Sequence, residues 1–232
     1  MNSMTKYGLV LVCLMATACS KQENAPTTKT APSPTASAAP SSNVQIDVGK
    51  FADGVYTNKY FKLKVTMPKD WHALSDAQRM QMMKVGANML AKGDKRMMSM
   101  LKASEVRTLN LFSFFQHKIG ARVKFNPSLL GVAENIAFAP GVTDGKAYLQ
   151  HAKALLQRAN MPFKVKDGFT KKSIGAKEFD VMEVHAHVKG MDITQKYMAY
   201  VDRGFAVAFV ISYLDDQQKA ALENALKAVE FH

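Results

Sequence analysis

The chain has 232 residues, a formal net charge of +12 and two cysteines. A chain of this length can form one domain with a substantial core, and its positive charge favours acidic partners such as lipid phosphates, lipopolysaccharide or acidic proteins. The sequence lacks the G-x-S-x-G, H-E-x-x-H, P-loop and Rossmann glycine motifs, and it has no paired carboxylates near a histidine. It therefore predicts no enzyme of these classes.

The first 18 residues have the pattern of an export signal. A short polar start with one cation precedes an apolar run over residues 8–16, about half of the roughly 20 residues that a membrane-spanning helix needs. Ala16-Thr17-Ala18 supplies the small residues of a cleavage site. With Cys19 next, the stretch resembles a bacterial lipobox, although Ala16 stands where Leu is more common. The resemblance implies cleavage before Cys19 and lipid on its sulfur and its amine; the alternative is an ordinary signal peptide with an incidental cysteine.

This interpretation predicts where the protein resides. Several acyl chains would anchor it stably to a bilayer. Ser20 stands where an Asp tends to hold Gram-negative lipoproteins at the inner membrane, so the resemblance implies the outer membrane, facing the periplasm. Export argues against nucleic acid as a partner. Cys13 would leave with the signal and Cys19 would carry the lipid, so no thiol remains for a disulfide, a metal site or a nucleophile, and the covalent lipid is the only cofactor we expect.

Residues 19–54 are expected to be the lipidated cysteine and a disordered tether. From Ser20 to Ser42 the chain is rich in Ala, Pro, Ser and Thr and has no aromatic residue, a composition that cannot bury enough apolar surface to fold. Such a segment can hold a domain away from the bilayer, or it can be a tail with no spacing role. Residues 55–232 show no second linker and no internal repeat, so they predict a single domain.

Hydrophobic periodicity predicts the elements in the first half of this domain. Apolar and polar residues alternate from Phe61 until Pro68, which indicates a half-buried strand. A helical period follows, and the later segment 108–117 has apolar residues on both faces, which indicates a central strand. The elements expected here are strands over 61–67, 108–117 and 132–139 and helices over 75–91 and 95–104.

The second half has the clearest pattern. Three segments separated by turn residues at 189–190 and 202–204 predict an antiparallel meander. Asp215 is expected to cap a final helix, with Gln218 as its capping-box partner. The elements expected here are a helix over 144–159, strands over 181–188, 193–201 and 205–213, and the last helix after Asp215. Helices interspersed among antiparallel strands predict an α+β fold, in which a central antiparallel sheet carries helices on its faces.

Both ends of the domain resemble PsbP-like proteins, the group that includes the photosystem II extrinsic protein and the DcrB-type periplasmic lipoproteins of bacteria. The residues that carry the resemblance are YTNKYFKLKVTMPKDW, from Tyr56 to Trp71, and KYMAYVDRGFAVAFVISYLDDQQKAALENALKAVEF, from Lys196 to Phe231. They follow the pattern of that family. The first stretch has an aromatic turn and a strand that ends in Pro, with Trp three residues on. The second has a hairpin followed by a helix and a short final strand. The resemblance implies an α/β/α sandwich that serves as a binding or assembly accessory without catalysis, and it carries over no metal-binding residue.

Two histidines and an acidic residue share one face of the strand expected over 181–188. Glu183, His185 and His187 alternate with apolar residues and project the same way, so they could bind Zn or Cu. A third ligand is not evident, although His151 or His117 could approach in space. The alternative, which so short a pattern favours, is a solvated polar face of the sheet.

The first expected helix is rich in methionine, and seven methionines fall within residues 80–100. Met80, Met82, Met83 and Met89 could form an adaptable apolar groove for a partner helix, or a Cu(I) site. The alternative, which their helical spacing favours, is that these side chains fill the core.

A basic segment surrounds Gly168 and Phe169. It could rest on phosphate-bearing lipid, whereas the alternative is a solvated edge whose lysines protect an exposed strand from aggregation. The lysines concerned are Lys164, Lys166, Lys171, Lys172 and Lys177.

Together these patterns predict a membrane-anchored lipoprotein of the cell envelope that acts as a non-catalytic binding or assembly module. Its expected partners are the bilayer, through acylated Cys19, and an envelope protein. The alternative is a periplasmic protein that binds a metal or a small ligand through His185 and His187.

Overall fold

The computed structural model describes residues 47–137, 139, 141–159, 162–188 and 190–232. The export signal, Cys19 and most of the expected tether lie outside these residues. The helices of the described part are α1 (Asp76–Ala91), α2 (Lys95–Glu105), α3 (Gly145–Arg158) and α4 (Asp216–Lys227). The strands are β1 (Lys50–Ala52), β2 (Val55–Asn58), β3 (Leu63–Thr66), β4 (His72–Ala73), β5 (Thr108–Phe115), β6 (Ser128–Asn135), β7 (Phe163–Val165), β8 (Thr170–Ile174), β9 (Lys177–Val188), β10 (Met191–Asp202), β11 (Phe205–Tyr213) and β12 (Val229–Phe231).

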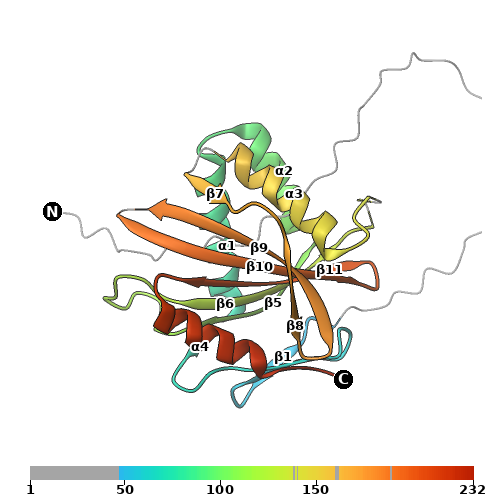
Figure 1. Cartoon of the computed structure of the whole chain (residues 1–232), viewed down its shortest axis with the longest axis vertical. Coiled ribbons are helices and arrows are strands. Elements are labelled where there is room, and N and C mark those ends of the chain that lie inside the picture. Colours follow the sequence, from blue (N-terminus) through green and yellow to red (C-terminus); the bar gives the residue numbers. More distant parts are fainter. Residues whose placement is uncertain (1–46, 138, 140, 160–161, 189) are drawn as a thin grey trace, which may run out of the picture.

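The strands form two antiparallel sheets (Figure 1). The larger sheet has eight strands, seven of them in the order β4-β5-β6-β11-β10-β9-β7, and β8 also pairs with β9. The smaller sheet has the order β1-β2-β3-β12, so the last strand of the chain joins strands from the start of the domain. The meander expected over 181–213 is present as β9, β10 and β11.

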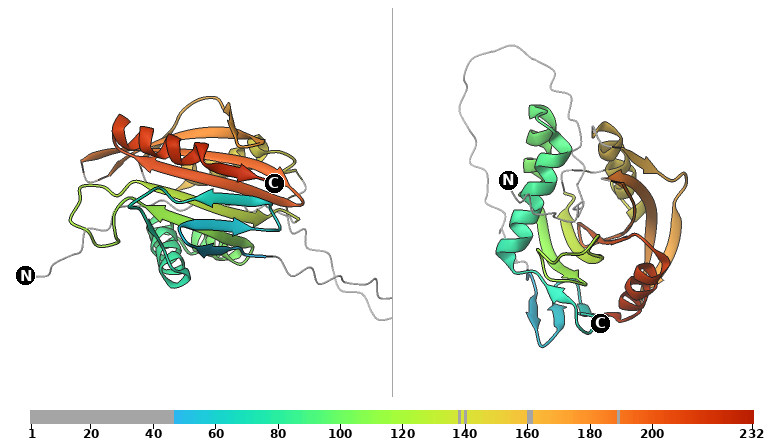
Figure 2. Two further views of the ribbon diagram at one scale, coloured as in Figure 1. Left: turned by 90° about the horizontal axis from the view of Figure 1, so that it is seen from below. Right: turned by 90° about the vertical axis from the view of Figure 1, so that its left-hand side faces the viewer.

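The larger sheet is the middle layer of three (Figure 2). Helices α1, α2 and α3 cover one face, and α4 with the smaller sheet covers the other. All nine residues of β11 are buried, because both of its faces are covered. The expected α+β fold, with helices packed on an antiparallel sheet, is confirmed.

Helix caps explain where two helices begin. The Ser75 side chain accepts a hydrogen bond from the Gln78 backbone and the Gln78 side chain reaches back, which makes a capping box at the start of α1. Asp215 caps α4 as expected, because its Oδ1 accepts from the Gln218 backbone N–H at 2.8 Å. The Gln218 side chain, however, accepts from the N–H of Leu214 at 2.8 Å, one residue earlier than a capping box requires.

Three sequence expectations need correction. Residues 50–52 fall within the expected tether, but they form β1 and pair with β2, so the folded domain begins before Val55. The strand expected to be central, β5, lies next to the edge of its sheet, because only the two residues of β4 pair with it on the outside. Its apolar faces come from the layers above and below it and not from strands on both sides. The strand expected over 132–139 is β6, which begins at Ser128 and ends at Asn135.

None of the helices in the described ranges is long and apolar enough to span a membrane.

Candidate functional site: an apolar groove at the β5 edge

A groove of about 790 Å³ opens along the outer edge of β5. The first half of α1 forms one wall, and β1 with the residues before it forms the other. These two walls belong to different layers of the sandwich, which meet at this edge of the larger sheet (Figure 2). The groove volume lies within the range of about 300–1,000 Å³ that is typical of ligand sites.

The floor of the groove is a part of β5 that lacks an outer strand partner. β4 pairs with Phe114 and Phe115, and the Leu74 N–H donates to the carbonyl of Ser113 at 2.9 Å. The chain then leaves the edge at Ser75 to begin α1. Within the described residues, Thr108–Phe112 therefore pairs with a strand only on the β6 side.

A β-bulge lies in this same stretch. The register between β5 and β6 shifts between Asn110 and Phe112, so Leu111 is the extra residue of β5. Asn110, Leu111 and Phe112 all line the groove. Bulges are common at sheet edges and beside functional sites, where they redirect side chains.

The α1 wall is the first half of the helix, which has no buried residue. The buried residues of α1 are Gly86, Leu90 and Ala91, all in its C-terminal half. Met80 and Met83, one turn apart near the start of the helix, line the groove, and Met80 is 52% exposed. The helix thus leaves this apolar stripe uncovered.

The β1 wall is held in place by Tyr56. The Tyr56 hydroxyl donates to the carbonyl of Val48 at 2.8 Å, and burial raises the pKa of this phenol, so it keeps its proton. Gly49 has φ +84°, and a Cβ there would lie 2.3 Å from the Tyr56 hydroxyl oxygen, so only glycine fits this close approach. The result is that Val48 and Phe51 are presented to the groove with 56% and 42% of their surface exposed.

Charged side chains stand at the rim. Arg79 forms an ion pair with Asp76 and donates through Nη1 to the carbonyl of Leu74 at 3.0 Å, so its charge is already engaged. Glu105, at the end of α2, also lines the groove and forms no ion pair within the described residues. The groove therefore carries one uncompensated carboxylate on a chain whose net charge is strongly positive.

The structure divides the four methionines of the expected groove. Met80 and Met83 line the groove, whereas Met82 packs against the core beneath the helices. Met89 is half-buried and does not line the groove. Sequence spacing does not reveal three further lining residues, Val48, Phe51 and Glu105, because two of them lie in the segment expected to be the tether and the third lies at the end of another helix.

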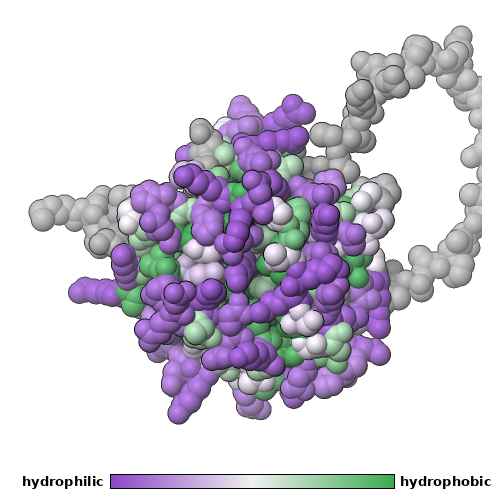
Figure 3. Space-filling view, viewed as in Figure 1, coloured by the Kyte–Doolittle hydropathy of each residue, from purple (hydrophilic) through white to green (hydrophobic). Residues whose placement is uncertain are grey.

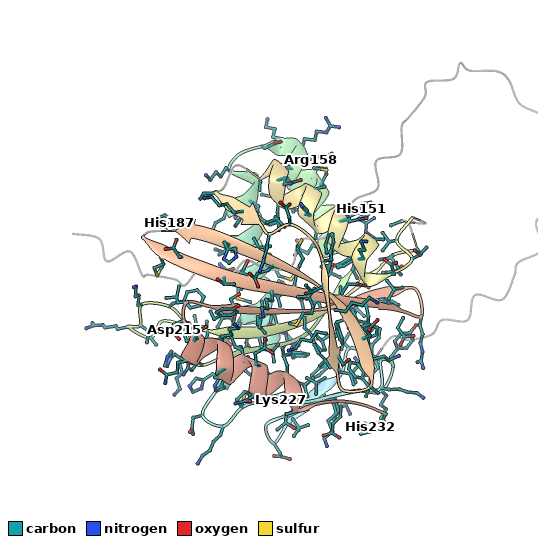
Figure 4. The ribbon with its side chains drawn as sticks, viewed as in Figure 1. His151, Arg158, His187, Asp215, Lys227 and His232 are labelled. Atoms are coloured by element: carbon teal, nitrogen blue, oxygen red, sulfur yellow. The ribbon has the colours of Figure 1, made fainter. Side chains whose placement is uncertain are left out.

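The two histidines of the possible metal site lie on one exposed face, as expected. His185 contacts Glu183 at 3.1 Å and Thr194 at 3.2 Å, whereas His187 pairs with Asp192 at 2.7 Å. His151 lies on α3, apart from His187 on the β9–β10 hairpin (Figure 4). The described residues contain no group of three or more His, Cys, Asp or Glu side chains placed to hold a metal ion.

The metal hypothesis stays a prediction with a direct test. If it holds, zinc titration followed by calorimetry will show stoichiometric binding that His185→Ala abolishes. A titration that gives the same small heats for the wild type and for His185→Ala would rule the site out, because the imidazole would then contribute nothing to binding.

Four of the five lysines proposed as a basic patch form ion pairs. Lys171 pairs with Glu178, and Lys172 with Glu223. The other two pairs are Lys177 with Asp202 and Lys166 with Glu183, both at 3.5 Å. Figure 3 shows a mainly hydrophilic surface on this face. Most of the positive charge in this segment is therefore matched locally, and contact of these lysines with lipid stays a prediction.

The sequence patterns do not predict one buried carboxyl group, that of Glu134. Glu134 on β6 is 3% exposed and accepts a hydrogen bond from the Ser104 hydroxyl of α2 at 3.1 Å. Burial raises its pKa to about 7, although the hydrogen bond from Ser104 and the charge of Arg107 act in the opposite direction. The sequence feature that could have indicated this group is a single Glu within the mainly apolar segment of β6.

No model of a known protein family matches the sequence, and no curated protein matches it. The solved structures similar to it include PsbP (CyanoP) from the cyanobacterium Synechocystis, 9% identical, with 84% of this chain and 98% of that chain covered and a TM-score of 0.46. LpqN, involved in cell envelope biogenesis of Mycobacterium tuberculosis, is 14% identical and has a TM-score of 0.41; the match covers 72% of this chain and 82% of LpqN. A Pseudomonas aeruginosa protein of unknown function is 11% identical and has a TM-score of 0.38; the match covers 50% of this chain and 78% of that protein. The likeness to PsbP-like proteins expected from both ends of the domain thus recurs among solved structures, and the DcrB-type subgroup stays a prediction.

Proposed function

We propose that this chain is a non-catalytic binding module of the cell envelope that docks a partner protein in the groove at the β5 edge. The observation that carries the proposal is where the exposed apolar side chains gather. Six large hydrophobic residues are exposed in the described part of the chain, and three of them, Val48, Phe51 and Met80, line this one groove. Apolar side chains that gather in one concave site mark a place of interaction, whereas scattered ones do not.

The energy available from this surface suits a reversible contact. Fully burying a Val, Phe or Met side chain contributes about 1.5–3 kcal/mol. Val48, Phe51 and Met80 are already half covered, so each has about 1 kcal/mol left to contribute when a partner covers it. Met83 and Leu111 extend the apolar lining between the walls. Methionine side chains can adjust their shape to a partner, which favours recognition by an apolar segment.

The proposal includes membrane attachment through Cys19. Acylation there would hold the module at a bilayer, where each buried methylene of the acyl chains contributes about 0.8 kcal/mol. We assign a spacing role to the Ala- and Pro-rich segment between Cys19 and the domain, because segments rich in Pro serve as spacers between attached parts. Ser20, after the lipidated cysteine, favours anchoring of the module in the outer membrane, where it would face the periplasm.

Site-specific photocrosslinking in living cells tests the docking function. A photoreactive amino acid at Met80 should give a discrete crosslinked protein, whereas the same amino acid at Lys227 on α4 should not (Figure 4). Phe51→Asp, combined with the photoreactive amino acid at Met80, places a charge in the groove and should reduce the crosslink about tenfold, since about 1.4 kcal/mol corresponds to that factor. Identical products from Met80 and Lys227, or a Met80 product that persists in Phe51→Asp, would contradict the proposal.

A further inference from the structure

We propose that the partner enters the groove as an added β-strand on β5, through a short run of apolar residues with a Lys or Arg at one end. This inference rests on the proposed docking function and names the conformation and chemistry of the docked segment. It differs from docking of a helix, which the methionines of α1 alone would suggest.

The outer edge of β5 is the first reason to expect an added strand. A strand that pairs on one side only presents unpaired N–H and C=O groups that can bind a further strand. On the outside of β5, β4 ends at Ala73 and the Leu74 N–H makes the last hydrogen bond of that edge, to Ser113. Thr108–Phe112, about 17 Å long at 3.4 Å per residue, continues the line that β4 has left. An added strand of about five residues would fill this gap in the sheet.

The walls explain why this edge would accept one segment and not a second sheet. Proteins usually protect an edge with Lys, Pro, a β-bulge or a covering element. The stretch Thr108–Phe112 reads TLNLF and has neither Lys nor Pro, and its bulge at Leu111 lies in the pairing with β6. Instead, α1 contributes Met80 from one layer, and β1 contributes Phe51 from the other, to the groove along this edge. Such walls would block another sheet edge while leaving a slot for one extended chain.

The two walls also set the side chains that the slot would accept. Successive side chains of a strand point to opposite faces. One set would meet Met80 and Met83, and the other would meet Val48 and Phe51, so both faces of the added strand would be covered by apolar residues. Strands buried on both faces have continuous apolar sequences. The expected segment is therefore an uninterrupted apolar run and not an alternating one.

The charge of Glu105 in the groove predicts a Lys or Arg at one end of the docked segment. Glu105 lines the groove where α2 leads into β5, and no Lys, Arg or His of the described residues forms an ion pair with it. Arg79, the one cation among the lining residues, is engaged by Asp76 and by the carbonyl of Leu74. A Lys or Arg at the matching end of the segment would complete the pair with Glu105.

Selection of random twelve-residue peptides on the purified full chain tests the inference. We expect enriched peptides with four to five consecutive apolar residues, rich in Val, Ile and Phe, next to a Lys or Arg. Enriched peptides with apolar residues at helical spacing (i, i+3, i+4, i+7) would overturn strand addition and leave docking in the groove standing. Failure to enrich any peptide would count against both the inference and the proposed function.

Two further measurements on an enriched peptide sharpen the result. N-methylation of its backbone, one position at a time, should weaken binding at least tenfold at every second residue, because alternate N–H groups of an added strand point to β5. Glu105→Lys should change the selected flanking residue from Lys or Arg to Asp or Glu, whereas Asp167→Lys, a fully exposed carboxylate in a loop, should not. Equal tolerance of all methylated positions would overturn strand addition, and an unchanged preference in Glu105→Lys would overturn the role of Glu105.

Discussion

Phe209→Ala is expected to lower the free energy of unfolding by about 3–5 kcal/mol, the range for truncating a buried Phe. Phe209 is fully buried in β11, at the centre of the larger sheet. Its ring centroid lies 5.5 Å from that of Phe112 on β5 and 5.2 Å from that of Phe179 on β9, so one side chain joins three strands. Opposite it, Gly131 leaves the space that the Phe112 ring fills. Such a loss is a large part of the 5–15 kcal/mol that typical domains have.

Urea unfolding followed by fluorescence measures this loss, since Trp71 is the single tryptophan of the chain and is 8% exposed. Phe51→Ala is the matched control, because the same side chain is removed from the groove wall, where it is already 42% exposed. Its cost should be about 1 kcal/mol. Equal losses of stability in the two variants would contradict either the central packing of Phe209 or the exposure of Phe51.

The sheet could be predicted from the sequence where local pattern determines the structure. In β9 the alternation from Met182 to Ala186 places apolar residues toward the core and His185 toward solvent, and the turns set the register of the meander. The position of β5 in the sheet could not be predicted this way. Its residues Leu111, Phe112 and Phe114 pack in the core beneath the smaller sheet. Phe115 packs in the core beneath the helices. A strand buried between such layers has the same sequence pattern as one flanked by strands.

The groove could be predicted in part, for a similar reason. Met80 and Met82 have equal hydrophobicity and lie on the same helix, yet one lines the groove and the other packs against the core. The direction in which each methionine side chain faces depends on how α1 packs against the rest of the fold. Helical spacing alone does not determine this packing. Val48 and Phe51 adjoin a composition typical of a tether, and only the pairing of β1 with β2 reveals that they belong to the wall.

Glu134→Gln is expected to stabilise the protein at high pH and to leave its stability nearly unchanged at low pH. Burial raises the pKa of Glu134 from the usual 4.5 to about 7, so the folded protein holds a proton that the unfolded chain releases near pH 4.5. The stability contributed by this group is therefore complete below about pH 4.5 and is lost as pH rises through about 7. Each unit of pKa difference corresponds to about 1.4 kcal/mol, so the wild type should lose about 3 kcal/mol that Glu134→Gln retains at pH 8.

The difference between the two proteins isolates this one carboxyl group, because histidines and other carboxylates titrate in both. Gln keeps an oxygen to accept the hydrogen bond from Ser104 but cannot ionise. Urea unfolding at pH 4, 6 and 8 should show a gap between the variant and the wild type that widens with pH. Glu178→Gln removes an exposed carboxylate of β9 that pairs with Lys171 at the surface, and it should change the stability at pH 8 by no more than about 1 kcal/mol. A constant gap for Glu134→Gln would mean that Glu134 ionises alike in the folded and unfolded chain. A widening gap would show that the apolar layer between α2 and β6 carries a carboxyl group that favours folding only while it is protonated.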